Sequence, residues 1–375
     1  MNTATQEFEP VWAVGFMTGT SIDAVDAAMI RTDGDKIFEF GPVVEVPYSD
    51  EERAIIHAAV QAARDWNWQG PPPEDAFSPA KAIAVDRHRD ALEKLRDDWN
   101  GPAPTIAGIH GQTVLHRRPI PGQRGATLQI IDAPAMREAL DLSIAYDFRT
   151  ADVDAGGEGA PLAPIYHKAL LAGAALHGAA VLNLGGVANI TAIDSQGDLL
   201  AFDCGPANGP IDEWVSGHGR GTHDAGGVLA AAGQVDASRL ERSLGHIYFS
   251  EKPPKSLDRY DFSAQLVTGL SLEDGAATLT ELCARAVALG LTHIDVPVDR
   301  LILCGGGRHN PALLAAIRRA MSCDVQLAED LGWRGDSIEA EAFALLAVRT
   351  LRGLPISFPK TTGVSEPRIG GRILA

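Results

Sequence analysis

The stretch "VGFMTGTSIDAVDAAMI", residues 14–30, decides the fold of this chain. An apolar run leads into Gly-Thr-Ser, and a second apolar run follows the turn. Apolar runs separated by a glycine-containing turn are typical of paired strands. A Walker loop feeds a helix instead and carries the G-x-x-x-x-G-K-[ST] pattern, which this stretch lacks. We therefore predict strands over residues 12–17, 24–31 and 36–40, with Asp33-Gly34 marking the second turn.

The middle of the chain repeats this pattern. "AVLNLGG" (residues 180–186) reads as a strand that ends in glycines, "VANITAID" returns, and "LLAFD" (residues 199–203) follows a short turn. Two similar three-stranded segments predict an internal duplication, and 375 residues are too many for one ordinary core. We expect one domain over residues 1–148 with 345–375 and another over residues 149–344. The sequence also predicts a helix from about residue 79 to 100, a strand over residues 301–304 and a loop-like tail over residues 353–375.

Composition narrows the possible functions. A net charge of −17 argues against nucleic-acid binding, which needs a basic face. Small anions remain possible ligands, because glycine turns and helix ends bind them locally. The sequence lacks the features of a signal peptide or an apolar membrane span, so we expect a cytoplasmic protein without a membrane partner. The four cysteines are far apart and form no C-x-x-C pair, which predicts reduced thiols and argues against zinc.

Three glycine motifs are candidate phosphate or nucleotide contacts. Backbone amides and hydroxyls of "GTSIDAVD" are able to reach phosphate oxygens, and Asp23 suits Mg²⁺ bound through water. In "NLGGVANI" the two glycines allow close backbone approach, and "FDCGPANGPID" adds Asp203 at a strand end. "CGGGRHNP" places three glycines before a helix that Asn310 would cap. Taken singly, each motif is also compatible with a plain tight turn.

Polar clusters follow two further predicted strands. "HGQTVLH" puts His110, Gln112 and Thr113 where sugar hydroxyls are commonly bound, although a surface loop would look the same. "AYDFRTADVDAGGEGAPLAP" places Asp147 and Arg149 before a glycine run, as a site or as a simple salt bridge. The histidines of "HGRGTH" have a spacing that fits no helical pair of metal ligands.

The order of the glycine motifs resembles that of actin, hexokinase-like sugar kinases and heat-shock chaperone ATPases, in which two duplicated domains close over a nucleotide. Within that superfamily, the whole set resembles the anhydro-N-acetylmuramic acid kinase family over roughly residues 11–370. The motifs that carry this resemblance are "GFMTGTSIDAVD", "GIHGQTVLHR", "YDFRTADVDAGGEGAPLAP", "LNLGGVANIT", "FDCGPANGPID", "CGGGRHNP" and "EAEAFALLAVRTLRGLP".

The resemblance implies an α/β fold of two duplicated actin-like (ribonuclease H-like) domains with mixed central sheets and a nucleotide cleft between them. It implies a kinase that uses ATP, Mg²⁺ and water on 1,6-anhydro-N-acetylmuramic acid, a small amino sugar. The products are N-acetylmuramic acid 6-phosphate and ADP, as part of peptidoglycan recycling in the bacterial cytoplasm. It also implies a homodimer.

The resemblance further implies a role for individual residues. Asp147 is the expected catalytic base, and Asp23 and Asp203 are expected to hold Mg²⁺ through water. The expected ATP contacts are Gly19, Thr20, Ser21, Ile22, Asp23, Ala24, Val25, Asp26, Gly185, Gly186, Asn189, Asp203, Gly205, Gly305, Gly306, Gly307 and Asn310. The expected sugar contacts are His110, Gln112, Thr113, Arg149, Gly156, Gly157 and Glu339.

Three positions depart from the family pattern: Ala24 stands for a usual glycine, Cys204 for threonine and Glu158 for glutamine. Two other functions stay open at this point. A simple sugar kinase would use Asp147 to deprotonate a free hydroxyl. An actin-like filament protein or chaperone ATPase would not need the "HGQT" and "DFR" clusters.

Overall fold

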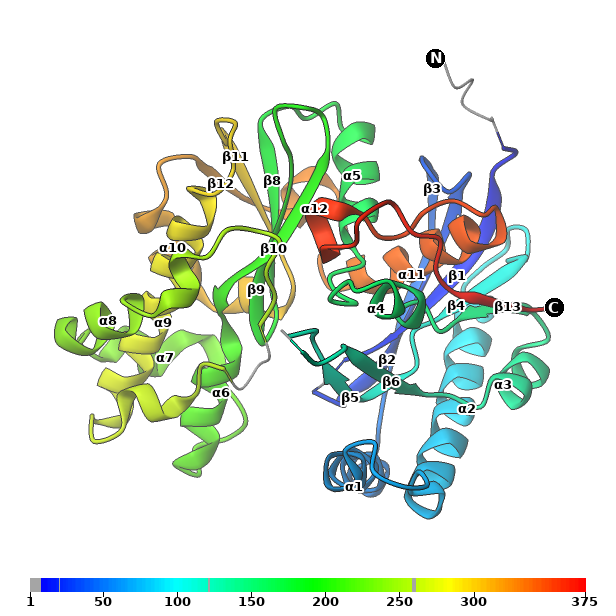
Figure 1. Cartoon of the computed structure of the whole chain (residues 1–375), viewed down its shortest axis with the longest axis horizontal. Helices are drawn as coiled ribbons and strands as arrows, with labels where there is room; N and C mark the ends of the chain where they lie inside the picture. The colour runs from blue at the N-terminus through cyan, green and yellow to red at the C-terminus, as the bar shows by residue number, and fades with distance from the viewer. Residues whose placement is uncertain (1–7, 20, 121, 258–260) are drawn as a thin grey trace. The chain divides into compact units, whose positions relative to one another are not determined.

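The computed structural model describes residues 8–19, 21–120, 122–257 and 261–375 (Figure 1). The chain forms two compact units, each around its own sheet. The first comprises Met1–Gly173 and Glu339–Ala375, and the second comprises Ala174–Ile338. The N-terminal and C-terminal parts of the chain therefore belong to the same unit.

The first unit contains a six-stranded mixed sheet with the order β13-β7-β4-β1-β2-β3. β1 pairs antiparallel with β2, which pairs antiparallel with β3, while β1, β4 and β7 run parallel to one another. The strands are β1 (Val11–Thr18), β2 (Ala24–Thr32), β3 (Ile37–Pro47), β4 (Ile106–Ile109), β7 (Ser143–Tyr146) and β13 (Arg372–Leu374). A separate two-stranded sheet pairs β5 (Gln112–Arg117) with β6 (Ala126–Ile130).

The second unit repeats the first five strands of this arrangement. Its sheet has the order β10-β9-β8-β11-β12. β9 is antiparallel to both of its neighbours, whereas β8, β11 and β12 are parallel. The strands are β8 (Ala179–Leu184), β9 (Val187–Ile193), β10 (Leu199–Pro206), β11 (Arg300–Cys304) and β12 (Asp324–Leu327). In chain order both sheets read 3-2-1-4-5, so the predicted duplication and the actin-like α/β fold class are confirmed.

Helices cover the sheet of the first unit, and one of them touches the strands without intervening side chains. An added Cβ on Gly15 of β1 would lie 1.9 Å from the carbonyl oxygen of Ala340, and one on Gly108 of β4 would lie 2.0 Å from that of Phe343. Both carbonyls belong to α11 (Ile338–Leu351). The helix backbone therefore rests directly on two strands, which only glycine permits. The other helices of this unit are α1 (Asp50–Trp66), α2 (Glu74–Asp97), α3 (Ala133–Leu140), α4 (Thr150–Asp154), α5 (Pro164–Gly173) and α12 (Pro359–Thr362).

Two local predictions in this unit were wrong. A helix was expected from about residue 79, but α2 begins at Glu74 and contains Pro79 in its second turn, where the missing N–H removes only one helical hydrogen bond. The C-terminal tail was expected to be a loop, but β13 pairs antiparallel with β7. Three residues are too few to show an alternating apolar pattern, so sequence periodicity misses this strand.

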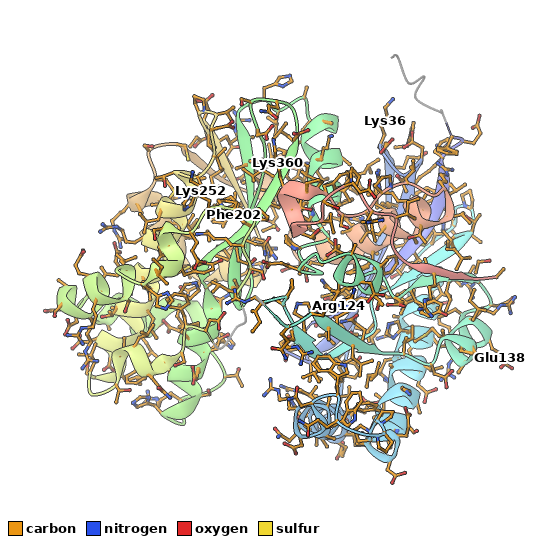
Figure 2. All side chains as sticks on the ribbon, viewed as in Figure 1. Lys36, Arg124, Glu138, Phe202, Lys252 and Lys360 are labelled. Atoms are coloured by element: carbon orange, nitrogen blue, oxygen red, sulfur yellow. The ribbon has the colours of Figure 1, made fainter. Side chains whose placement is uncertain are left out.

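The helices of the second unit pack around α9 (Leu272–Leu291), which is buried along much of its length. Phe202 of β10 (Figure 2) belongs to the same buried core as Cys283, Ala284 and Val287 of α9. The other helices are α6 (Asn208–Gly217), α7 (Val228–Ala232), α8 (Ala237–Leu244) and α10 (Pro311–Ala320). Short 3₁₀ turns span Ala225–Gly227, Ile247–Ser250, Ala264–Val267, Gly306–His309 and Ala328–Leu331. In the described parts of the chain, no helix combines the length and apolar character that crossing a membrane requires.

The chain passes from the first unit to the second after residue 173 and returns after residue 338. The expected domain limits lie at residues 148 and 344. The chain beyond Asp147 stays with the first unit because Tyr166 of α5 donates a 2.5 Å hydrogen bond to Glu341 of α11. The start of α11 stays there because Ala340 lies against Gly15. The chain therefore crosses between units after α5 and before Glu339.

We predict that Gly15→Ala destabilises the first unit by about 2 kcal/mol or more, because the added methyl forces α11 away from β1. Gly173→Ala is the matched control, since an added Cβ there meets no atom within 4 Å. Urea unfolding measures both. A Gly15→Ala midpoint equal to that of the control would contradict the close packing of α11 on the sheet.

Candidate functional site

The first glycine motif is a tight hairpin turn between β1 and β2. The Ile22 N–H donates to the Gly19 carbonyl at 3.2 Å, and Ile22 itself has a positive φ of 57°. Asp23 is 65% exposed at its side chain and lies 3.4 Å from the Arg53 guanidinium. Among the expected ATP contacts here, Thr20 lies outside the described residues. The turn thus presents polar groups to solvent while Ile22 anchors it in the core.

The three expected contacts after this turn belong to β2 rather than to the turn itself. Ala24, Val25 and Asp26 pair with Pro47, Val46 and Glu45 of β3. Ala24 and Val25 are buried, while Asp26 is partly buried. The methyl of Ala24, where the family pattern has glycine, therefore sits within a paired strand.

The "HGQT" cluster is buried and attached to this turn, so its interpretation as a surface loop is wrong. His110 and Gln112 are each 4% exposed. The Thr18 hydroxyl donates to the Gly111 carbonyl at 3.1 Å, and the Gln112 amide donates to the Gly19 carbonyl at a longer 3.4 Å. The expected sugar and phosphate contacts are thus joined within one unit.

Arg149 is directed at His110. Its Nε and Nη2 lie 3.0 and 2.9 Å from His110 Nε2, and its Nη1 donates to the Gly159 carbonyl at 2.7 Å. Burial, together with the charge of Arg149, holds the pKa of His110 well below its usual range. Burial also lowers the pKa of Arg149 to about 10, against the opposing carboxylates of Glu339 and Asp152. At neutral pH the pair is therefore a guanidinium donating to a neutral imidazole.

Two buried polar atoms in this cluster have no hydrogen bond of normal geometry among the described residues. They are His110 Nδ1, which carries the proton when Nε2 accepts from Arg149, and Gln112 Oε1. Buried polar groups are almost always paired, so such atoms are natural contacts for a ligand. One is a donor and the other an acceptor, which suits sugar hydroxyls.

Asp152 organises the glycine run, a role that sequence reasoning missed. Its Oδ2 accepts from the Gly159 N–H at 2.7 Å, and its Oδ1 accepts from the Thr362 hydroxyl at 2.6 Å. An added Cβ on Gly157 would lie 2.3 Å from Asp152 Oδ2, so this glycine is required for the close approach. The Glu158 N–H donates to the Thr362 carbonyl at 2.7 Å. The partner, Thr362, is too distant in sequence to be anticipated.

Asp147 lies directly after β7, in a backbone conformation with a positive φ of 57°. Its Oδ1 accepts a hydrogen bond from the Thr150 hydroxyl. Its Oδ2 pairs with Arg372 Nε of β13 at 3.0 Å. The salt bridge expected as an alternative role for Asp147 thus exists, but its partner is Arg372 rather than Arg149.

In the second unit, the turn after β8 meets the start of α6. The Asn208 N–H donates to the Gly185 carbonyl and the Gly209 N–H to the Gly186 carbonyl, each at 3.0 Å. An added Cβ on Gly307 would lie 2.7 Å from Leu184 Cβ. The second and third glycine motifs, about 120 residues apart in sequence, are therefore adjacent in this unit.

The triple glycine precedes α10 as predicted, and Asn310 caps that helix. Asn310 Oδ1 accepts from the N–H groups of Ala312 and Leu313 at 3.0 and 3.2 Å. Gly305 has a positive φ of 77°, and an added Cβ there would lie 2.3 Å from Asn183 Oδ1. The predicted cap is confirmed, and the side-chain oxygen of Asn310 already accepts two hydrogen bonds from the helix.

Asp203, predicted at a strand end, lies within β10 at a β-bulge between Asp203 and Gly205, and the strand continues to Pro206. Its Oδ2 accepts from the Leu257 N–H at 2.8 Å, and its N–H donates to the Lys255 carbonyl at 3.0 Å. Asn189, another expected ATP contact, lies opposite Asp203 on β9. The segment around Lys255 was not anticipated, although "KPPKS" interrupts the surrounding helical sequence.

Cys204 and Lys255 are buried beside Asp203. The Cys204 thiol donates to the Ala188 carbonyl at 3.2 Å, so it forms a hydrogen bond within the sheet. The family pattern has a threonine hydroxyl at this position. Burial raises the pKa of Cys204 well above its usual range. The Lys255 ammonium donates to the Tyr248 carbonyl at 2.8 Å and lies 4.4 Å from the centre of the Tyr248 ring.

Arg308 fastens the glycine loop to the segment that follows β12. Its side chain is 2% exposed and donates to Glu329, to Asp336 and to the Gly305 carbonyl, at distances from 2.6 to 3.2 Å. The hydrogen bond from Arg308 lowers the pKa of Asp336 to about 2. Burial alone would lower the pKa of Arg308, but both carboxylates outweigh it and raise that pKa.

Metal ligation has no support from the histidine motif. His218 Nδ1 contacts the Trp214 carbonyl at 2.8 Å, and His223 Nδ1 contacts Thr222. Within the described residues, no group of three or more histidine, cysteine, aspartate or glutamate side chains is arranged to hold a metal ion. A water-mediated ion at Asp23 and Asp203 needs fewer protein ligands and stays a prediction.

The duplicated sheets, with a glycine turn after the first strand of each and a third glycine loop before α10, define a protein of the actin-like class that includes the sugar kinases. The model of the family described as anhydro-N-acetylmuramic acid kinase matches residues 11–375. The chain therefore belongs to the anhydro-N-acetylmuramic acid kinase family.

Curated relatives agree over nearly the whole chain. The anhydro-N-acetylmuramic acid kinase of Rhizobium rhizogenes is 48% identical over 373 residues, covering 97% of this chain and 99% of that protein. The enzyme of the same name from Caulobacter vibrioides is 49% identical over 366 residues, covering 96% and 98%.

Solved structures with lower similarity were also found. Component A of (R)-2-hydroxyglutaryl-CoA dehydratase from Acidaminococcus fermentans aligns with a TM-score of 0.44 and 14% identity, covering 91% of this chain and 99% of that one. A ROK hexokinase from Thermus thermophilus aligns with a TM-score of 0.35 and 15% identity, covering 91% and 99%.

We predict that the Arg308 cluster makes stability depend on pH in the acidic range. The pKa of Asp336 is about 2 in the folded chain and about 3.9 in an unfolded one. Its stabilising effect is therefore complete above about pH 4 and disappears as the pH falls through about 2. Asp336→Asn should lower the thermal midpoint at pH 7, and the difference from the parent should shrink below pH 4.

Glu241→Gln, at an exposed position on α8, is the control for this measurement and should show no such convergence. A difference between Asp336→Asn and the parent that stays constant from pH 7 to pH 2.5 would contradict the role of the Asp336 carboxylate.

Proposed function

We propose that this chain phosphorylates 1,6-anhydro-N-acetylmuramic acid with ATP and water, giving N-acetylmuramic acid 6-phosphate and ADP. The observation that carries the proposal is family membership over residues 11–375. The buried cluster around His110 supports it, because this cluster offers a donor and an acceptor to a sugar. A filament protein or chaperone would have no need of these groups.

The sugar is bound, in this proposal, by His110, Gln112, Thr113, Arg149, Gly156, Gly157 and Glu339. Arg149 orients the imidazole of His110, and Asp152 holds the glycine run open. Arg149 remains charged at neutral pH, so it also stabilises negative charge that develops on the sugar.

The reaction needs one base. Water attacks C1 while the base takes one of its protons, and the C1–O6 bond breaks with its electron pair moving to O6. The O6 oxygen then attacks the γ-phosphorus, and the bond to the ADP oxygen breaks. We assign the base to Asp147. Thr150 and Arg372 each contact one oxygen of Asp147 in this structure, and lone pairs remain on both oxygens to accept the proton.

ATP is expected to contact the glycine turns at residues 19–26, 185–186 and 305–307, with Asn189, Asp203, Gly205 and Asn310. When bound, Mg²⁺ neutralises charge on the phosphates. The exposed carboxylate of Asp23 and the carboxylate of Asp203 at the bulge of β10 are hard oxygen donors suited to holding it through water. We also propose that the protein acts in the cytoplasm as a homodimer.

Product analysis tests the function directly. The protein is incubated with ATP, Mg²⁺ and either 1,6-anhydro-N-acetylmuramic acid or N-acetylmuramic acid, and the products are separated by mass. We expect the 6-phosphate of N-acetylmuramic acid from the anhydro sugar. Phosphorylation of only the free sugar would establish a simple sugar kinase instead, and ATP hydrolysis with no sugar product would contradict the proposal.

We predict that Asp147→Asn lowers kcat by about 10²–10⁴-fold, the usual contribution of a general base, while ATP binding stays near normal. Asp203→Asn is a contrasting variant, because it removes a carboxylate that we propose holds Mg²⁺ and should weaken nucleotide affinity as well as turnover. Steady-state turnover and nucleotide affinity are measured for both. Near-normal turnover of Asp147→Asn would exclude Asp147 as the base.

A further inference from the structure

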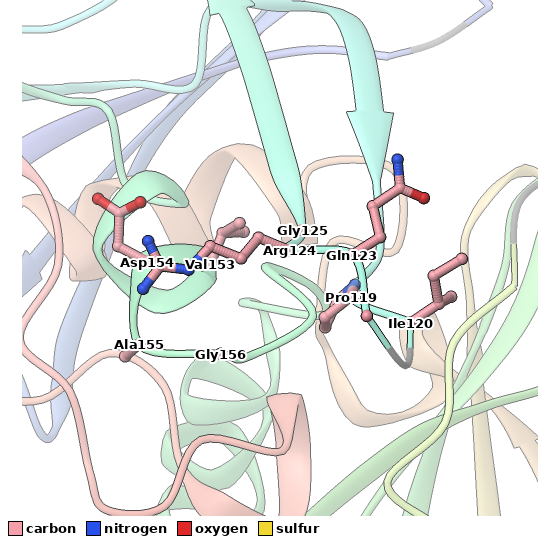
Figure 3. Close-up of a pocket in the computed structure, with 10 residues that line it drawn as sticks. Pro119, Ile120, Gln123, Arg124, Gly125, Val153, Asp154, Ala155 and Gly156 are labelled. Atoms are coloured by element: carbon pink, nitrogen blue, oxygen red, sulfur yellow. The ribbon is translucent and has the colours of Figure 1, made fainter.

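A pocket of about 430 Å³ lies beside the expected sugar contacts of the first unit. One wall is the loop that joins β5 to β6, including Arg124 and Gly125, and the other is the end of α4 with Val153, Asp154 and Gly156. Figure 3 shows the Arg124 side chain extending from this loop toward α4. The volume is in the range of small-molecule sites.

The pocket adjoins the His110–Arg149 pair. Val153 Cγ1 lies 3.1 Å from the position of an added Cβ on Gly125, and Val153 Cγ2 lies 2.7 Å from one on Gly159. The carbonyl of Gly159 in turn accepts the hydrogen bond from Arg149. Val153, which lines the pocket, therefore also contacts Gly159, the residue whose carbonyl accepts from Arg149.

The arginines near this pocket differ in whether their guanidinium groups already have partners in the protein. Arg149 already donates from three nitrogens, to His110 and to Gly159. Arg117 of β5 stacks on the Trp68 ring at 4.8 Å. Arg124 is exposed and makes no hydrogen bond, ion pair or ring contact with the described parts of the chain. Among the described residues that line the pocket, Arg124 is the one with a cationic side chain.

The expected substrate has a chemical group that pairs well with such a cation. Muramic acid sugars carry a carboxylate on an ether side chain, whereas the corresponding glucosamine sugars carry a free hydroxyl there. The net charge of −17 makes the chain as a whole repel anions, so a local cation has to offset this. A guanidinium pairs with a carboxylate through two parallel hydrogen bonds, which gives both attraction and geometric selection.

We propose that Arg124 binds the carboxylate of the sugar in this pocket and so selects acidic amino sugars over neutral ones. The inference rests on the proposed function and adds a specificity-determining residue to it. Asp154 lines the same pocket with a negative charge that opposes the carboxylate. The two side chains should thus affect affinity in opposite directions.

Kinetics with two substrates test this inference. Arg124→Gln should raise KM for 1,6-anhydro-N-acetylmuramic acid about tenfold, since a charge-assisted pair is lost. It should leave kcat/KM for 1,6-anhydro-N-acetylglucosamine, which lacks the carboxylate, within about twofold of the parent. Arg124→Lys should retain part of the affinity, because it keeps the charge but not the planar fork.

Two further variants make the result specific. Asp154→Asn should lower KM for the acidic sugar, the opposite of the change in Arg124→Gln. Arg96→Gln removes an exposed arginine of α2 that does not line the pocket, and it should change neither substrate's kinetics. Equal thermal midpoints of the variants show that folding is intact.

The outcomes separate this inference from the proposed function. The inference is wrong if the parent chain phosphorylates the acidic sugar and Arg124→Gln leaves the ratio of kcat/KM for the two sugars unchanged. Arg124 would then not bind the carboxylate. An equal loss on both sugars would also overturn it. If the parent phosphorylates neither sugar, the proposed function itself fails.

Discussion

The direct contact between α11 and two strands is the constraint on which the first unit depends. Gly15 and Gly108 leave no side chain between the sheet and the helix backbone, so the last part of the chain is bound to the first. This contact places Glu339 at the start of α11, where its charge acts on Arg149. It also places Glu341 against Tyr166. The proposed sugar site therefore combines residues 110–157 with Glu339 from the C-terminal part of the sequence.

Each unit positions its functional groups with the same sheet order but stabilises them differently. In the first unit, hydrogen bonds connect the glycine turn to the polar cluster that follows β4, through Thr18 and Gln112. In the second unit, backbone hydrogen bonds and glycine contacts connect the turn after β8 to α6 and to the triple glycine. Arg308 then fixes the triple glycine by two carboxylates. The duplicated fold thus supports one cluster suited to a sugar and one set of glycine loops suited to a nucleotide.

Sequence patterns predicted those features that depend on neighbouring residues. The glycine hairpins, the strand before the triple glycine and the Asn310 cap are local, so spacing and residue type were sufficient. The strand β13, the Asp147–Arg372 pair and the Asp152–Thr362 hydrogen bond join residues more than 200 positions apart. No local pattern marks such pairs. The burial of the "HGQT" cluster was missed for the same reason, because α11 and Arg149 cover it from distant parts of the chain.

The central claim is that this chain couples addition of water at C1 of the sugar to phosphoryl transfer onto O6. The most direct measurement runs the reaction in water enriched in heavy oxygen and locates the label by mass spectrometry of the sugar phosphate. The account predicts one heavy oxygen on C1 and none in the phosphate. The hydroxyl on C1 exchanges slowly with solvent, so a short reaction and a control with preformed N-acetylmuramic acid 6-phosphate correct for exchange. Label in the phosphate, or a C1 oxygen without label beyond this control, would contradict the account.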